Sequence, residues 1–434
     1  MPVHDILTPQ EAAYIATNSY FTLKDWISGA PKVGMESHAN VKNRVLGAAD
    51  AGNMQNTSLK GTDLGSANLK RVFAGTTGMG TNTGFGYLLK FQKGDRRHAV
   101  IATRGTRPEL GAPDLLTDAR AAMTSFGDFG LVHKGFKTTF DSVINNIARD
   151  NSSIMDADVV HCVGHSLGGA VATLMAAHYA RLGKSVKLYT FGSPRVGAFS
   201  AHSALEKMLG KNNIFRTAHD LDPITLIGPY PYIHVNPAPS DQNNFTLPSP
   251  TGSLFSVANH DMALYINSVA TNGVDATWEE VRSLADKCDH ENSVLAKWLL
   301  HKDNNPGWVQ YASAKTLGLL FKLFSHVLKT TRTAVILGLT AVDLLAEMIH
   351  NGLCKLGLYA TQIFSLLRHA AAWAGLKMAA GADFTAGIIK IIFNKMMSTL
   401  TAMAAHAVVM RNSGMMPLPL IIAGGWSLVS GSAY

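Results

Sequence analysis

One serine has the neighbours that a nucleophile needs. Ser166 lies in "GHSLG", residues 164–168, which fits the pattern G-x-S-x-G. The apolar run 159–163 before it predicts a strand, and the alanine-rich run 167–182 after it predicts a helix. A turn from a strand straight into a helix is so tight that glycines must flank its corner, where the hydroxyl is presented. We therefore take Ser166 as the candidate nucleophile.

A serine hydroxyl attacks a carbonyl group only when a base removes its proton and an acid orients that base. Around such a turn the partners follow in the chain order serine, acid, histidine. Two carboxylates compete in "AHDLDP", Asp220 and Asp222. Asp222 ends a strand-like run and precedes Pro223, so we expect it to be the acid, and we expect Asp220 to be a turn or surface carboxylate.

Several histidines are candidates for the base. His219 and His234 lie close to the acid in the sequence, and His161 and His165 lie beside the serine. The latter two are four residues apart across a strand and a turn, not on one helix face, so we expect no metal pair. His260, in "NHDMALYI", follows a long loop and begins a helical run. We favour His260, because a loop there would place an imidazole beside Ser166.

The helix after Ser166 also offers chemistry. Its first amide groups have no partner within the helix and point toward the serine, which favours a developing oxyanion. We expect the amide of Leu167 to be the first oxyanion donor.

These residues need a framework, and the hydrophobic pattern predicts one. Short apolar runs at 98–104, 158–163, 185–191 and 213–218 alternate with helical segments at 135–149 and 167–182. This alternation predicts an α/β fold with a mostly parallel sheet and helices on both faces. We further expect a helix over 9–27, turns in the glycine-rich stretch 75–87, a long loop over 236–253 and helices after 278.

Composition limits the class of protein. The chain has 434 residues and 47% hydrophobic content, enough for a sizeable core. Its three cysteines are too few for a disulfide framework, which favours synthesis in a reducing compartment. The first twenty residues contain Asp5 and Glu11 and lack an unbroken apolar run, so we expect no Sec signal peptide.

The C-terminal region differs from the rest. Of a net charge of +8, about +7 lies in residues 315–434, which hold 10 Lys and Arg against 3 Asp and Glu. Its apolar runs are interrupted before they reach about 18 residues, so they predict helices that pack together or lie on a membrane, not spanning helices. The basic excess favours an anionic membrane or an acidic partner. Nucleic acid is not expected, because the basic residues are dispersed among aliphatic ones.

Several stretches together resemble the class 3 lipase family of α/β-hydrolases. They cover residues 95–268 and include "TRGT" (103–106), "DLLTDA" (114–119), "VHKGF" (132–136), "GHSLGGAVATLMA" (164–176), "YTFGSPRVG" (189–197) and "NHDMALYI" (259–266). The resemblance implies an α/β-hydrolase core with Thr106 as the second oxyanion donor. It also selects Asp222, through the spacing of Arg216 and Pro229, and places the base at His260.

The family carries a lid in the region that corresponds to residues 107–131. Five apolar residues there are expected to form either the apolar face of a lid or part of the core: Leu110, Leu115, Leu116, Phe126 and Phe129.

The two ends of the chain depart from the compact members of the family. We predict an N-terminal segment (1–95), a hydrolase domain (96–303) and a helical, basic, apolar C-terminal region (304–434). A signal-less lipase core with such an extension resembles the antibacterial phospholipase effectors of bacterial type VI secretion systems. That resemblance implies secretion by a specialised system, action at a target-cell membrane or periplasm, an immunity protein and a secretion-apparatus protein as partners.

The resulting hypothesis is a serine hydrolase of the phospholipase A type that cleaves membrane glycerophospholipids, with no cofactor and no metal. The sequence leaves three alternatives open. The first is a neutral-lipid triacylglycerol lipase, the second is a toxin whose C-terminal helices permeabilise bilayers, and the third is a scaffold in which the serine is a relic. The complete set of serine, aspartate and histidine argues against the last.

Overall fold

The computed structural model describes residues 5–20, 22, 64, 67–77, 81–106, 123–228, 232–234, 243–250, 257–269, 277–288, 346, 349, 350, 357–376 and 384–409.

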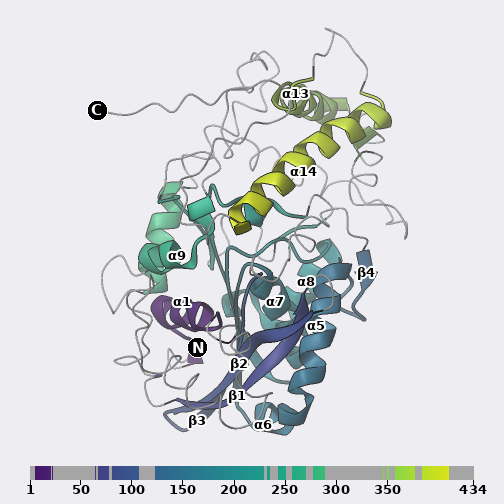
Figure 1. Ribbon diagram of the computed structural model, residues 1–434. Coiled ribbons are helices and arrows are strands. Elements are labelled where there is room, and N and C mark those ends of the chain that lie inside the picture. Colours follow the sequence, from purple (N-terminus) through teal and green to yellow (C-terminus); the bar gives the residue numbers. More distant parts are fainter. Residues whose placement is uncertain are drawn as a thin grey trace.

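A seven-stranded sheet forms the centre of the molecule (Figure 1). Its strands lie in the order β1 (Asn68–Thr77), β2 (Thr81–Lys93), β3 (Arg96–Thr103), β6 (Val159–His165), β7 (Ser185–Phe191), β8 (Ile214–His219) and β9 (Asn244–Leu247). The five strands from β3 to β9 are parallel, and the β1–β2 and β2–β3 pairs are antiparallel. The predicted α/β fold with a mostly parallel sheet is confirmed.

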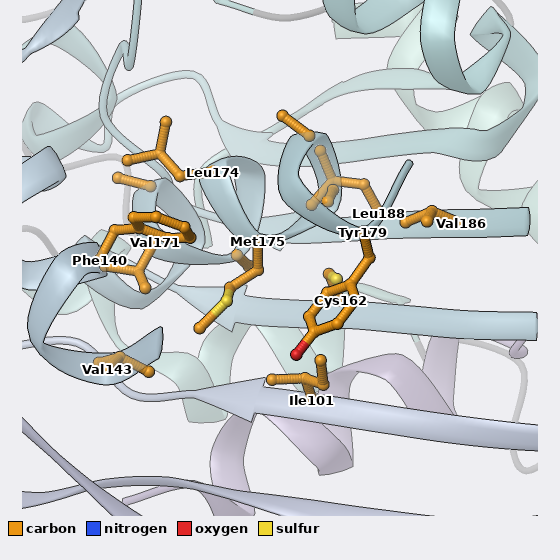
Figure 2. Close-up of a cluster of buried hydrophobic side chains, with 14 of the residues drawn as sticks. Ile101, Phe140, Val143, Cys162, Val171, Leu174, Met175, Tyr179, Val186 and Leu188 are labelled. Carbon is orange, nitrogen blue, oxygen red and sulfur yellow. The ribbon is translucent and has the colours of Figure 1, made fainter. Parts of the chain in front are cut away.

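One face of the sheet is covered by α5 (Lys134–Ile147), α7 (Leu167–Arg181) and α8 (Phe199–Leu209). Figure 2 shows side chains of α5 and α7, among them Val143 and Met175, meeting Ile101, Cys162 and Leu188 from three neighbouring strands. All of these side chains are buried in one continuous hydrophobic core. The short segment between α5 and β6 contains the 3₁₀ helix η4 (Ala148–Asp150) and α6 (Asn151–Met155). This core therefore fixes the positions of β6 and α7, and with them the corner between the two elements.

The other face carries α1 (Pro9–Asn18) and α9 (Met262–Val269), which contact each other. Thr8 and Glu11 form a capping box at the start of α1. The Leu7 amide donates to the Tyr189 hydroxyl (2.9 Å), and the Trp278 indole donates to the Leu7 carbonyl oxygen (2.8 Å). These bonds join the N-terminal helix to the sheet and to the helical residues 278–288.

Two expectations about loops are wrong. Within the glycine-rich stretch 75–87, residues 75–77 end β1 and residues 81–87 begin β2 instead of forming turns, and residues 78–80 lie outside the described residues. Its glycines make room across the sheet: a Cβ atom at Gly86 would lie 2.0 Å from the Ala102 carbonyl oxygen and 2.6 Å from the Phe73 ring. Within the stretch 236–253, β9 pairs with β8, because Phe245 and Leu247 are buried in the core.

A small hairpin precedes α5. Strands β4 (Met123–Ser125) and β5 (Leu131–His133) pair antiparallel and enclose Phe126 and Phe129. Both rings are buried, and they meet edge to face at 5.7 Å between centroids. These two residues therefore belong to the core and not to the face of a lid. Leu110, Leu115 and Leu116 lie outside the described residues.

Two long helices belong to the C-terminal region, α13 (Gly357–Trp373) and α14 (Ala386–Val409). Figure 1 shows them at the end of the molecule opposite α6. They contact each other, and the Phe364 and Phe384 rings meet at 5.0 Å. In the described part of the chain, no helix combines the length and hydropathy needed to cross a bilayer. The boundaries of the three predicted regions stay a prediction.

Candidate active site

Ser166 lies at the corner between β6 and α7. Its backbone has φ 58° and ψ −132°, and it is the one non-glycine residue with positive φ among those described. Such a conformation costs free energy and persists only where the surroundings enforce it. Here a buried strand and a buried helix hold both sides of the corner.

The flanking glycines are required by contact. A Cβ atom at Gly164 would lie 2.2 Å from the Gly168 carbonyl oxygen, and one at Gly168 would lie 2.2 Å from the Thr103 carbonyl oxygen. Both neighbours are backbone atoms, so no side-chain movement relieves the clash. The pattern G-x-S-x-G therefore has a direct steric cause in this molecule.

Asp222 and His260 form a hydrogen-bonded pair. Asp222 lies after β8, caps the 3₁₀ helix η6 (Pro223–Leu226) and is completely buried. Its Oδ1 accepts from the Ile224 amide (2.9 Å), and its Oδ2 accepts from His260 Nδ1 (2.8 Å). Because Nδ1 donates to the carboxylate, Nε2 is the basic nitrogen of the imidazole. His260 ends the 3₁₀ helix η7 (Val257–His260).

The end of β7 connects this pair to the serine. The Ser166 amide donates to the Phe191 carbonyl oxygen (3.0 Å). At the next residue, Gly192, a Cβ atom would lie 2.7 Å from Asp222 Oδ2 and 3.0 Å from His260 Nδ1. The structure thus brings Ser166, Asp222 and His260 to the same edge of the sheet, as their order in the chain predicts.

The two expected oxyanion donors also lie beside the serine. Leu167 is the first residue of α7, where an amide has no partner within the helix. A Cβ atom at Gly105 would lie 2.7 Å from Ser166 Cβ, so the loop that carries Thr106 packs against the nucleophile. The Thr106 hydroxyl is buried and makes no hydrogen bond within the described part of the chain. Within the described residues, the site therefore has a buried hydroxyl next to Ser166 that has no hydrogen-bond partner.

Residues 100–231 match the family described as Lipase (class 3). This segment is therefore similar to the class 3 lipases. The match contains Thr106, Ser166, Leu167 and Asp222, and it ends before His260.

Two curated relatives resemble part of this chain. The secreted mono- and diacylglycerol lipase 1 of Fusarium solani is 31% identical over 37% of this chain and 48% of its own length. The toxin TseL of Vibrio cholerae serotype O1 is 33% identical over 29% of this chain and 20% of its own length. The chain thus spans about half the length of the fungal relative and a fifth of the toxin.

Among solved structures, a mutant of the Penicillium cyclopium enzyme MDLA is 23% identical, with a TM-score of 0.39. The likeness covers 58% of this chain and 83% of that one. The nonglycosylated LIP2 lipase of Yarrowia lipolytica is 20% identical with a TM-score of 0.38, over 52% of this chain and 76% of that one.

Tyr265 belongs to the candidate active site and was not predicted from the sequence. Its hydroxyl accepts from the His219 amide (3.0 Å) and donates to Asp222 Oδ2 (2.7 Å). Burial and the nearby Asp222 raise the pKa of Tyr265 well above its usual value, so the hydroxyl stays protonated and keeps donating. The only hint in the sequence is its place five residues after His260.

Tyr20 and His165 form a second unpredicted contact. The Tyr20 hydroxyl lies 2.6 Å from His165 Nδ1 and accepts from the Gly105 amide (3.2 Å). His165 Nε2 in turn lies 3.0 Å from the His260 carbonyl oxygen. One tyrosine of the N-terminal segment therefore joins the loop of Thr106, the serine corner and the segment of His260.

The rejected candidates have other partners. Asp220 Oδ1 accepts from the Ser249 amide (3.0 Å) and hydroxyl (2.8 Å). His219 Nδ1 lies 2.7 Å from the Asn259 carbonyl oxygen, and His234 Nε2 lies 2.7 Å from that of Thr225. His161 Nε2 lies 2.9 Å from His98 Nδ1. Among the described residues, no group of three or more His, Cys, Asp or Glu could hold a metal ion.

Proposed function

We propose that this protein is a serine ester hydrolase that cleaves the acyl esters of lipids. The observation that carries the proposal is the bond from His260 Nδ1 to the buried Asp222, beside a serine held in a strained corner. Structural ion pairs are common in proteins, but they do not require a neighbouring serine with positive φ. The class 3 lipase match over residues 100–231 supports the same reaction.

Each residue has one task in this reaction. His260 Nε2 takes the proton of Ser166 as its Oγ attacks the acyl carbonyl carbon. The amides of Leu167 and Thr106 stabilise the negative charge on the carbonyl oxygen. His260 then gives the proton to the leaving alcohol, and the acyl group stays on Ser166. A water molecule, deprotonated by His260, releases the fatty acid and restores the serine.

Asp222 keeps the imidazole in the right tautomer and stabilises its charged form. The Tyr265 hydroxyl donates to the same carboxylate oxygen, Asp222 Oδ2, and so helps to hold the carboxylate in place.

The proposed substrate is a membrane glycerophospholipid, cleaved as by a phospholipase A. The basic excess of residues 315–434 supports this choice, since an anionic bilayer attracts it. The fungal relative, named a mono- and diacylglycerol lipase, favours neutral acylglycerols as the second candidate. The relative named toxin TseL supports a toxic role. An antibacterial target, secretion by a specialised system and an immunity protein are further parts of the proposal.

A substrate panel tests the proposal. Wild-type protein and Ser166→Ala are each given phospholipid vesicles, a triacylglycerol emulsion and a diacylglycerol emulsion, and both fatty-acid release and dye leakage are measured. We expect release from phospholipid by the wild type, and a loss of at least about a thousandfold in Ser166→Ala. Release from acylglycerols alone would make the protein a neutral-lipid lipase. Equal release by Ser166→Ala would refute the serine mechanism.

Dye leakage distinguishes the proposed hydrolase from a toxin that permeabilises membranes. If vesicles leak equally with wild type and Ser166→Ala while neither releases fatty acid, the protein is a membrane-permeabilising toxin. The proposal requires that vesicles leak only where their lipids are hydrolysed, and therefore that Ser166→Ala causes no leakage.

A further inference from the structure

A buried threonine joins the loop of Thr106 to the helix that follows the nucleophile. Thr103 is the last residue of β3 and is completely buried. Its hydroxyl donates to the Gly168 carbonyl oxygen in the first turn of α7 (2.7 Å), and the Val163 carbonyl oxygen in β6 lies 3.3 Å away. A hydroxyl carries a single proton, so the shorter contact is the main hydrogen bond. The side chain of Thr103 therefore connects the end of β3 to the start of α7.

This bond links the two chain segments that carry the expected oxyanion donors. Thr106 comes three residues after Thr103, and Leu167 directly precedes Gly168. The two backbones also touch, because a Cβ atom at Gly168 would lie 2.2 Å from the Thr103 carbonyl oxygen. The hydrogen bond and the backbone contact together set the separation between the loop of Thr106 and the first turn of α7.

Packing alone does not explain the hydroxyl. The Gly168 carbonyl oxygen lies inside α7, where the amide four residues later is its ordinary partner, so it needs no second donor. The preceding residues of β3, Ala99–Ala102, are apolar and buried. Valine would fill the volume of Thr103 without a polar atom that needs a partner. The hydroxyl therefore adds a directed bond at a place where a hydrophobic core requires none.

An oxyanion site works only at a defined separation of its donors. Each amide must lie about 2.7–3.1 Å from the position that the oxyanion will occupy. The two donors here belong to different elements, and an error of about 1 Å in position can cost about a hundredfold in rate. A bond that fixes these elements against each other therefore affects the transition state.

We propose that the Thr103 hydroxyl positions the oxyanion site by fastening the loop of Thr106 to the first turn of α7. The inference rests on the proposed function, because the oxyanion forms during ester hydrolysis. The hydroxyl contacts backbone oxygens, so Thr103 is a positioning residue that acts through the amides of Thr106 and Leu167. Because the oxyanion is present in the transition state and absent from the bound ester, loss of the bond lowers kcat and leaves KM nearly unchanged.

A second threonine supplies a matched control. The Thr173 hydroxyl donates to the Gly169 carbonyl oxygen (2.8 Å), also in the first turn of α7, and Thr173 is buried as well. Thr103→Val and Thr173→Val replace the same hydroxyl by a methyl group, but only the bond of Thr103 reaches α7 from the loop of Thr106. Thr103→Ser keeps the hydroxyl and loses only the methyl group.

Hydrolysis of a dissolved short-chain ester by the full-length protein separates kcat from KM. In Thr103→Val we expect kcat to fall by between about tenfold and a hundredfold, less than for a whole oxyanion donor, with KM changed by less than about twofold. Thr173→Val and Thr103→Ser should stay within about threefold of the wild-type kcat. The pH dependence of kcat/KM should keep its midpoint in Thr103→Val, because Ser166 and His260 stay in place.

The outcomes distinguish this inference from the proposed function. If no hydrolysis depends on Ser166, the proposed function is refuted. If hydrolysis depends on Ser166 but folded Thr103→Val and Thr173→Val have equal kcat, the positioning role is refuted. A loss in Thr103→Val that lies in KM, or that comes with a shifted pH midpoint, also overturns this role, because it would arise in substrate binding or in the catalytic pair.

Another pair of variants tests the same role if Thr103→Val does not fold. Thr103→Ser and Thr103→Cys differ in one atom, and a thiol is a much weaker donor than a hydroxyl. We expect kcat of Thr103→Cys to be about tenfold or more below that of Thr103→Ser, at a similar KM. Equal kcat values for these two variants would overturn the inference.

Discussion

At the scale of single residues, the site depends on local order in the chain and on contacts that no local pattern contains. Ser166, Asp222 and His260 were predictable, because the nucleophile has a short pattern and its partners follow in a fixed order. Tyr20 was not, since its partner His165 is 145 residues away. Tyr265 and Tyr20 are buried tyrosines, which in a sequence cannot be told from ordinary core residues.

Two aspartates close in sequence have different environments and should respond differently to the same change. Asp222→Asn leaves His260 in the wrong tautomer, so we expect kcat to fall by roughly 10⁴-fold. Asp220→Asn changes an acceptor of the Ser249 amide and hydroxyl and leaves the Asp222–His260 bond in place, so it should keep most of the activity. The rates of ester hydrolysis by the two purified variants decide which aspartate is the acid. If Asp220→Asn were the inactive one, the assignment of the acid would be reversed.

At the scale of elements, the strand–turn–helix pattern was sufficient for β3, β6, β7 and β8 and for α5 and α7, because the strands are short apolar runs and the helices are longer segments between them. It failed for the β1–β2 hairpin and for β9. In the hairpin, glycines that favour turns in isolation make room for Phe73, Phe85 and Val143 between packed layers. Such close packing is a property of the tertiary structure and leaves no period in the sequence.

The serine corner makes a prediction about stability. In Gly164→Ala the new methyl group meets the Gly168 carbonyl oxygen, so we expect the free energy of unfolding to fall by about 2 kcal/mol or more. Gly387→Ala is the control, because the nearest atom to its Cβ is 3.9 Å away and the residue lies in a helix. The control should change stability by less than about 1 kcal/mol. Urea denaturation measures both, and equal values would contradict the steric account.

A buried histidine pair connects β3 and β6 on the face of α1. His98 Nδ1 lies 2.9 Å from His161 Nε2, and the two rings are stacked. Burial lowers the pKa of both, and for His161 the His98 ring and Lys187 add to the effect. For His98, Asp5 acts in the opposite direction and Arg96 and Lys93 in the same one.

This pair should make stability depend on pH. The unfolded histidines take up protons near pH 6.5, whereas the folded ones do so only at lower pH. The free energy of unfolding is therefore highest above about pH 6.5 and falls as the pH drops toward the folded pKa values. His161→Leu should fall less steeply between pH 7.5 and 5.5 in urea denaturation. An unchanged pH dependence in this variant would show that other groups cause it.

At the scale of the whole molecule, the chain joins a segment similar to class 3 lipases to helices with a different composition. The sequence was sufficient to predict that residues 304–434 contain apolar, basic helices, because that is a matter of composition. It was not sufficient to predict that α14 lies on η6 and η7. A helical period indicates which face of a helix is apolar, but it does not say which surface that face covers. The segment 107–122, where a lid was expected, lies outside the described residues.

The most direct test of the account is to find which residue reacts as the nucleophile. A fluorophosphonate, which modifies only activated serines, is added to the full-length protein with phospholipid vesicles, and the adduct is located by mass spectrometry. The account predicts an adduct on Ser166, formed at least about a thousandfold more slowly in His260→Ala. An adduct on a different serine, or an equal rate in His260→Ala, would contradict it.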